Sequence, residues 1–347
     1  MNLTKVWVAK LDDYVIDLAW SPDGALLAAA SAAGPLVLFD GAGGARRQEL
    51  AGHADGSNAI AWAPAKPPPA GAQLLASGGQ DGCVRFWSAP AGSQTAEIKL
   101  GSAWVDQLAW RPWPGRAGGE SLCLAAAAGR KLALLGPDGA VAHAFADAPK
   151  TLSALAWQPP GGAVAAAWFG GVGVWDAGDF HSRHQYPYGS AIAALAWSPD
   201  GRWLVAGTQD SAVHLWLPEE DQEFHMSGYE TKVRELSFSP DSRWLATGGA
   251  RDACVWDCSG AGPEGREPLA LPHAERVCAV AFQNRGGLLA TAAQNNEVGL
   301  WLPAQNGASV ATVRLTAPAS KLAWSPDDTR LAIGSPQGGV LVLRVDV

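Results

Sequence analysis

The sequence contains few cysteines and no long apolar run. Its five cysteines are scattered and odd in number, so they do not suggest a disulfide framework, and a reducing compartment fits best. No stretch approaches the roughly 18 to 20 apolar residues of a membrane helix. Residues 1–11 also lack the apolar core of a secretion signal. These absences predict a cytoplasmic protein that does not insert into membranes.

Positive charge is also scarce. Lys and Arg together number 25 against 33 Asp and Glu, which gives a net charge of −8, and no basic cluster stands out. The positive surface that neutralises phosphate groups is therefore missing, and nucleic acid is not expected as a partner. Charged residues make up only 17% of the chain and hydrophobic residues 48%, a balance that predicts a compact protein rather than a disordered one.

A short motif recurs along the whole chain: an apolar residue, a small residue and then Trp or Phe. The aromatic residues of successive copies are 40 to 48 residues apart, close to the period of a known class of β-repeat. The eight copies are Leu18-Ala19-Trp20, Ile60-Ala61-Trp62, Leu108-Ala109-Trp110, Leu155-Ala156-Trp157, Leu195-Ala196-Trp197, Leu236-Ser237-Phe238, Val280-Ala281-Phe282 and Leu322-Ala323-Trp324. In a repeat protein each repeat packs only against its neighbours, so a chain of 347 residues can form one domain without a single large core.

Each copy continues with the same series of short strands. A turn such as Ser21-Pro22-Asp23-Gly24 follows the motif, and Pro, Asp and Gly favour such a tight corner. A strand of small residues comes next, and then a strand that ends in an aromatic residue, as in Val84-Arg85-Phe86-Trp87. No stretch with a helical period competes with these runs, so the sequence predicts an all-β class.

The sequence resembles the WD-repeat family over nearly its whole length. Trp175-Asp176 and Trp256-Asp257 are intact copies of the dipeptide that names the family, and Gly52-His53 keeps its Gly-His start. The resemblance implies a single β-propeller, 1–347, of eight four-stranded blades, or seven if one degenerate copy does not form a blade. Residues 4–10 would complete the last blade and close the ring. The expected repeat cores are 15–40, 57–88, 105–136, 152–176, 192–217, 233–257, 277–302 and 319–345.

The resemblance also implies a structural role for a set of polar residues. In this family a hydrogen-bonded tetrad ties the turn between blades to the third strand, and His53, Ser77, Asp81 and Trp87 match it. His273, Thr291 and Trp301 repeat the pattern with Asn295 in place of Asp. Thr247, Asp252 and Trp256 repeat it with Tyr229 in place of His. A Ser/His/Asp set could also indicate a hydrolase. The repeat positions and the lack of a nucleophile-elbow motif favour the structural interpretation, and we expect no enzyme activity.

Residues on the face that WD propellers usually present to partners are mixed in charge and type. They predict a protein or peptide partner for a chain that is monomeric by itself, and exposed aromatic residues would anchor it. Arg251 and Arg276 would grip a carboxylate. Ordinary solvated loop residues are the alternative. The candidates are Tyr14, Asp17, Gln80, Trp104, Gln107, Arg130, Trp168, Phe169, Lys232, Glu235, Arg251 and Arg276. Trp113 and the long turns Ala63–Ala72 and Arg111–Glu120 suggest a second contact surface or simple insertions on the opposite face.

Three histidines raise zinc binding as an alternative function. His181 and His184 lie on an expected fourth strand, and His225 lies on the corresponding strand of the next repeat. Residues three apart on a regular strand point to opposite faces, which argues against joint ligation by His181 and His184. Cys254 and Cys258 lack the spacing of a metal site, and buried free thiols are expected there. The leading prediction is a non-catalytic interaction scaffold without a cofactor.

Overall fold

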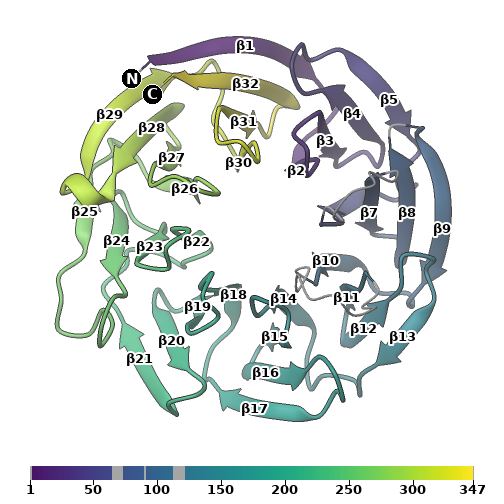
Figure 1. Cartoon of the computed structure of the whole chain (residues 1–347), viewed down its shortest axis with the longest axis horizontal. Coiled ribbons are helices and arrows are strands. Elements are labelled where there is room, and N and C mark those ends of the chain that lie inside the picture. Colours follow the sequence, from purple (N-terminus) through teal and green to yellow (C-terminus); the bar gives the residue numbers. More distant parts are fainter. Residues whose placement is uncertain (1, 65–72, 90, 112–121, 347) are drawn as a thin grey trace.

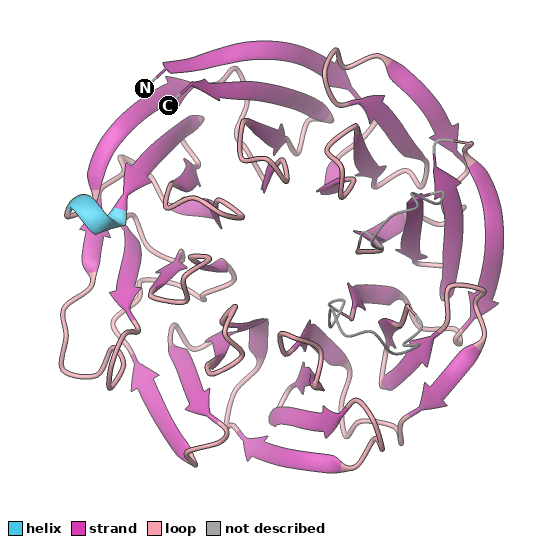
Figure 2. Ribbon diagram, in the orientation of Figure 1, coloured by secondary structure: helices cyan, strands magenta, loops and turns pink. Residues whose placement is uncertain are grey.

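The computed structural model describes residues 2–64, 73–89, 91–111 and 122–346. In this part of the chain, eight four-stranded antiparallel sheets stand in a ring as the blades of a propeller (Figure 1). Figure 2 shows that strands dominate, with one turn of 3-10 helix, η1 (Pro303–Gln305). None of the described segments is a helix long and apolar enough to cross a membrane. The predicted all-β propeller of eight blades is confirmed.

Blades 1 to 4 follow one another along the chain, and each contains four consecutive strands. Blade 1 contains β2 (Val15–Trp20), β3 (Leu26–Ser31), β4 (Leu36–Asp40) and β5 (Arg46–Leu50). Blade 2 contains β6 (Ser57–Trp62), β7 (Gln73–Gly79), β8 (Cys83–Ala89) and β9 (Ser93–Lys99). Blade 3 contains β10 (Val105–Trp110), β11 (Leu124–Ala128), β12 (Lys131–Leu135) and β13 (Val141–Ala144). Blade 4 contains β14 (Leu152–Trp157), β15 (Ala163–Trp168), β16 (Gly171–Asp176) and β17 (Ser182–Pro187).

Blades 5 to 7 continue this order, and blade 8 joins the two ends of the chain. Blade 5 contains β18 (Ile192–Trp197), β19 (Leu204–Thr208), β20 (Val213–Leu217) and β21 (Gln222–Met226). Blade 6 contains β22 (Leu236–Phe238), β23 (Trp244–Thr247), β24 (Ala253–Asp257) and β25 (Leu269–Leu271). Blade 7 contains β26 (Val277–Phe282), β27 (Leu289–Ala293), β28 (Glu297–Leu302) and β29 (Ala308–Arg314). Blade 8 contains β30 (Lys321–Trp324), β31 (Arg330–Gly334), β32 (Gly339–Asp346) and β1 (Asn2–Lys10).

The first strand of each blade lies innermost, and the fourth lies at the outer rim (Figure 1). The second strands are buried on both faces because each sheet packs between two neighbours, and this explains their continuous runs of small apolar residues. The fourth strands alternate between half-buried and exposed residues, as β9 shows. The core is therefore a set of hydrophobic clusters, each shared by two adjacent blades.

The recurring motif joins neighbouring blades through indole hydrogen bonds. Trp62 donates its Nε1–H to the carbonyl of Ala19 in the preceding blade at 2.9 Å, and Trp110 does the same to Ala61 at 2.9 Å. The backbone carbonyl of the small residue in one motif accepts a hydrogen bond from the tryptophan of the next motif. The motif therefore links neighbouring blades. Trp20, Trp157 and Trp324 follow the same pattern with Ala323, Ala109 and Ala281, whereas Nε1 of Trp197 has no hydrogen-bond partner among the described residues.

The ring closes by pairing the two ends of the chain. β1 runs antiparallel to β32, from Asn2 opposite Asp346 to Lys10 opposite Gly339. Trp7 points into the core between blades 8 and 1, where its Nε1–H donates to the carbonyl of Gly41 at 3.2 Å and its ring lies 5.6 Å from that of Phe39. The predicted closing strand 4–10 is confirmed, and it extends to Asn2.

Candidate partner-binding face

The loops of one face of the ring are brought together by the strand order. In an antiparallel blade, the connection that enters the first strand and the turn that leaves the second lie at the same end. Hydrogen bonds join the two kinds of loop: Ala32 donates its N–H to Tyr14, and Thr231 donates to Gly249, both at 3.0 Å. We call this surface the connection face. Its connections are 11–14, 51–56, 100–104, 145–151, 188–191, 227–235, 272–276 and 315–320, and its turns are 32–35, 80–82, 129–130, 169–170, 209–212, 248–252, 294–296 and 335–338.

Three large aromatic side chains stand out from this face. Tyr14 is 53% exposed, Trp104 is 53% exposed and Phe169 is 58% exposed. Among the described residues, the other large hydrophobic side chains that are exposed are three valines: Val6, Val8 and Val141. Tyr14 and Trp104 precede first strands, and Phe169 lies in a turn between second and third strands, so all three belong to the connection face. Exposed aromatic side chains are the preferred anchors of protein interfaces.

The prediction that Trp168 is exposed beside Phe169 is wrong. Trp168 is the last residue of β15 and is only 7% exposed. Its ring lies 6.5 Å from that of Trp175, and it lines a small cavity between blades 3 and 4. Strand β15 ends at Trp168, which points into the interior, and Phe169 is the first residue of the turn and projects outward.

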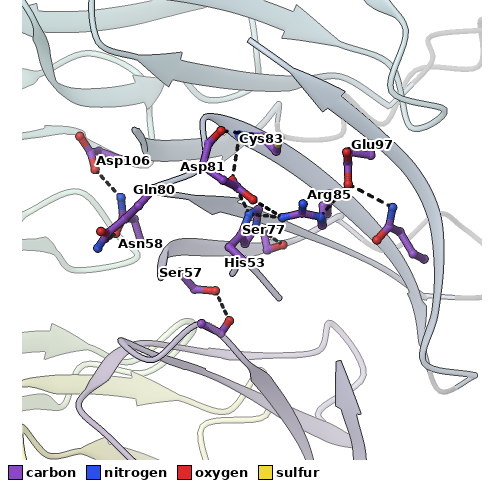
Figure 3. Close-up of polar contacts among 12 residues, drawn as sticks. His53, Ser57, Asn58, Ser77, Gln80, Asp81, Cys83, Arg85, Glu97 and Asp106 are labelled. Atoms are coloured by element: carbon purple, nitrogen blue, oxygen red, sulfur yellow. Dashed lines mark hydrogen bonds and ion pairs between the residues drawn. The ribbon is translucent and has the colours of Figure 1, made fainter. Parts of the chain in front are cut away.

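Several candidate residues make contacts within the ring. Asp17 accepts a hydrogen bond from the N–H of Ile60 in the next blade at 3.2 Å, and Lys321 lies 3.7 Å from the same carboxylate. Gln80 donates to Asn58 at 3.3 Å (Figure 3). Arg130 is exposed but donates to the carbonyl of Ala148 at 2.6 Å. These side chains position the loops and connect the blades.

The remaining candidates differ in exposure. Gln107 is half-buried on the inner strand β10, whereas Lys232, Arg251 and Arg276 are exposed. The loops that carry the two arginines are joined, because Val277 donates its N–H to the carbonyl of Ala250 at 3.0 Å. No ion pair holds either arginine within the described part of the chain. The predicted carboxylate grip by this pair stays a prediction.

Glu235 is half-buried just before β22, on the innermost layer of the ring. Burial raises its pKa to about 7, and the nearby charges of Lys321 and Arg234 offset only part of this effect. The ordinary pKa of a glutamate carboxyl is 4.5. At a pH between 4.5 and about 7, Glu235 is therefore deprotonated in the unfolded chain but still protonated in the folded chain. Stability must therefore fall as the pH rises through this interval, and the penalty persists above it.

Glu235→Gln is expected to leave stability unchanged near pH 4.5 and to raise it at pH 8 by about 1 to 3 kcal/mol. The amide has no charge to desolvate, so the variant loses the penalty that the wild type carries above pH 7. Urea unfolding of both proteins at the two pH values measures the difference. An equal difference at both pH values would show that Glu235 does not titrate as described.

The His53 tetrad is a buried structural element of blade 2. His53 contacts the Asp81 carboxylate through Nδ1 at 2.8 Å and the Ser77 hydroxyl through Nε2 at 2.9 Å (Figure 3). Trp87 donates its indole N–H to the same hydroxyl at 2.9 Å. Burial lowers the pKa of His53, and the hydrogen bond with Asp81 offsets part of that effect. Ser77 and His53 are both fully buried, so a substrate has no access to this Ser/His/Asp set.

The other two tetrads depart from the predicted pattern. His273 contacts Thr291 through Nε2 at 2.8 Å, and Trp301 donates to the same hydroxyl at 2.8 Å. The other imidazole nitrogen of His273 contacts the carbonyl of Leu271 at 2.8 Å, whereas Asn295 donates to a neighbouring glutamate. The prediction that Asn295 takes the place of Asp is therefore wrong, because a backbone acceptor already satisfies the imidazole.

In blade 6 the phenol of Tyr229 replaces the imidazole. Its hydroxyl lies 2.9 Å from the Thr247 hydroxyl, and Trp256 donates its indole N–H to the Tyr229 oxygen at 2.8 Å. The phenol is longer than an imidazole, so its oxygen meets the indole directly. The histidine-containing and tyrosine-containing sets both tie the connection before a blade to the third strand of that blade.

The three histidines of the zinc hypothesis have separate surroundings. His181 lies beside Asp179, the ring of His184 stacks 5.6 Å from that of Tyr186, and the ring of His225 lies 5.7 Å from that of His214. Within the described ranges, one group of potential metal ligands comes together, and it consists of Asp176, Asp179 and His181. It does not include His184 or His225.

Asp176 is already engaged by the protein. Partial burial raises its pKa, but hydrogen bonds from the N–H of Gly178 and from Arg183 outweigh this and lower it to about 2. All five cysteines, Cys83, Cys123, Cys254, Cys258 and Cys278, are free. Burial raises the pKa of the Cys254 thiol to about 11 and that of Cys258 to about 12. Trp113 and most of the two long turns, residues 65–72 and 112–120, lie outside the described residues.

Comparison with known proteins agrees with this architecture. The family model described as "WD domain, G-beta repeat" matches residues 2–34, 44–88, 181–216 and 221–257. Each match starts at the outer strand of one blade, or one or two residues before it, and continues into the next blade, which is the offset that makes β1 the closing strand. No curated protein matches the sequence.

A similar solved structure is that of the computationally designed Ika8 protein. It shares 19% sequence identity with this chain and superimposes with a TM-score of 0.80, over 99% of this chain and 100% of that one. At this identity the likeness concerns the fold alone. Together, the matched repeats, the eight four-stranded blades and the closing strand support the WD-repeat β-propeller family for this chain.

Proposed function

We propose that this protein is a non-catalytic scaffold that binds a protein or peptide partner through the connection face. The observation that carries the proposal is the set of three exposed aromatic side chains, Tyr14, Trp104 and Phe169, on one face of the ring. Solvent-exposed rings of this size are costly to leave in water, and burying them against a partner gives large contact areas with little loss of side-chain freedom.

The ring supports this role by holding the loops in place. The connections and turns of the face are joined by backbone hydrogen bonds, and each blade packs against two neighbours. Loops fixed in this way lose little conformational freedom on binding, which favours affinity. The polar candidates around the aromatic side chains carry both signs of charge, a pattern that suits the polar rim of a protein interface.

The test is affinity capture from a lysate of the source organism with three forms of the tagged protein. These are the wild type, the double variant Trp104→Ala, Phe169→Ala, and the control variant Val141→Ala. Val141 is 49% exposed and lies at the opposite end of blade 3, where β13 begins. A partner should be retained by the wild type and the control, and its affinity should fall at least about tenfold for the double variant. A partner that binds all three forms equally would contradict the proposal.

We also propose that the protein acts as a monomer in the cytoplasm. Five unpaired cysteines favour a reducing compartment, and each blade packs against neighbours of the same chain, so no second copy is needed to complete the ring. Zinc binding by His181, His184 and His225 stays a prediction, and no observation of the described residues favours it over the scaffold role.

A further inference from the structure

A groove of about 450 Å³ runs between blades 7 and 8 at the outer rim of the ring. One wall is formed by β29 and the residues that follow it, and the other by β1 and β32. Its lining is largely apolar, and part of it, from Leu315 to Pro318 together with Ser335 and Gln337, comes from a connection and a turn of the connection face. The apolar lining includes Val8, Val313, Leu315, Ile333, Leu341 and Leu343.

A β-bulge in the closing strand shapes one wall. Lys5 pairs with Leu343 and Trp7 with Val342, so Val6 is an extra residue in β1. Because of this insertion, Lys5 and Val8 pair with residues two apart on β32, and their side chains lie on the same face although they are three apart in sequence. Lys10 shares that face, which places two cations at the two ends of an apolar strip.

The charged residues that line the groove are all cations. Arg314 stands on the opposite wall from Lys5 and Lys10, and no carboxylate lines the groove in the described part of the chain. None of the three forms an ion pair with another described residue. Glu297, which lies opposite Arg314 in the β28–β29 ladder, accepts a hydrogen bond from Asn295. A protein of net charge −8 thus concentrates positive charge around an apolar groove.

We infer that this groove binds an extended acidic peptide segment with a bulky apolar side chain at its centre. The stretch of β1 from Lys5 to Lys10 is roughly 15 Å long, which corresponds to about five residues of an extended chain. Cations at both ends match carboxylates on both sides of the apolar residue, and Arg314 adds a third contact. A single-headed amphiphile such as a fatty acid would leave one end unmatched. The inference does not depend on the proposed function, because Tyr14, Trp104 and Phe169 do not line this groove.

Fluorescence anisotropy with three labelled hexapeptides tests the inference. One has two acidic residues on each side of a phenylalanine–leucine pair, the second has lysines in place of the acidic residues, and the third has serines in place of the apolar pair. The first should bind at least about tenfold more tightly than the other two. The double variant Lys10→Glu, Arg314→Glu and the single variant Val8→Asp should each weaken that binding by about tenfold or more.

The matched control is Lys99→Glu, Lys150→Glu, which changes the net charge as much as the double variant does but at exposed lysines outside the groove. It should bind the acidic peptide as the wild type does. Equal affinity for all three peptides, an equal loss in the control, or displacement of the peptide by dodecanoate at concentrations below the peptide Kd would each overturn the inference. Circular dichroism checks that every variant is folded, and the substituted side chains are all exposed.

Discussion

Trp7→Ala should lower the free energy of unfolding by about 3 to 5 kcal/mol, the usual cost of removing a large buried aromatic side chain. Trp7 is the main apolar contact of the closing strand with blade 1, and the backbone of Gly44 lies against its ring with no room for a side chain. Its indole also donates to Gly41. The substitution therefore removes packing and a hydrogen bond at the point where the ring closes. Urea unfolding followed by tryptophan fluorescence measures the loss.

Val8→Ala is the matched control for this variant. Val8 is the next residue of the same strand, but it is 61% exposed. Its truncation should change stability by less than about 0.5 kcal/mol, because little buried surface is lost. If both variants were equally stable, the closing strand would contribute only backbone pairing, and the packing described between blades 8 and 1 would be wrong.

Ser77→Ala should lower the free energy of unfolding by about 2 to 4 kcal/mol. The substitution leaves two buried polar atoms without a partner, Nε2 of His53 and Nε1 of Trp87, and each such group costs about 1 to 3 kcal/mol. Blade 5 shows the arrangement that results, because Ala206 takes the equivalent position there and Nε1 of Trp216 has no hydrogen-bond partner among the described residues.

Ser77→Thr is the control, because Thr291 holds the equivalent position in blade 7 and makes the same two contacts. The conservative variant keeps the hydroxyl and should stay within about 1 kcal/mol of the wild type. Thermal unfolding of the three proteins separates the contribution of the hydroxyl from that of the packing. A Ser77→Ala protein as stable as Ser77→Thr would mean that the tetrad does not stabilise blade 2.

The blade count and the closing strand were predictable because they follow from repetition. Eight copies of one motif tolerate the loss of individual residues, and an incomplete last copy requires a strand from elsewhere. The hydrogen bonds between blades that the motif makes were missed. A backbone carbonyl carries no side-chain signature, so its role as acceptor is visible only when two blades are placed side by side.

The candidate site was less predictable because it depends on where single strands end. Trp168 and Phe169 are adjacent in sequence, yet one is buried and the other exposed, and a shift of one residue in the strand boundary decides which. The groove between blades 7 and 8 was missed for a similar reason. Only the bulge at Val6 brings Lys5 onto the same face as Val8, and bulges leave little trace in a single sequence.

Amide hydrogen exchange of the captured complex, compared with the free protein, tests the partner-binding claim most directly. We predict that the partner slows exchange in segments 11–14, 100–104 and 168–170, which carry the exposed aromatic side chains of the connection face. The turns at the opposite face, such as 21–25 and 41–45, should exchange as in the free protein. Protection confined to those turns or to the outer strands, with the aromatic loops unchanged, would contradict the proposed role of this face.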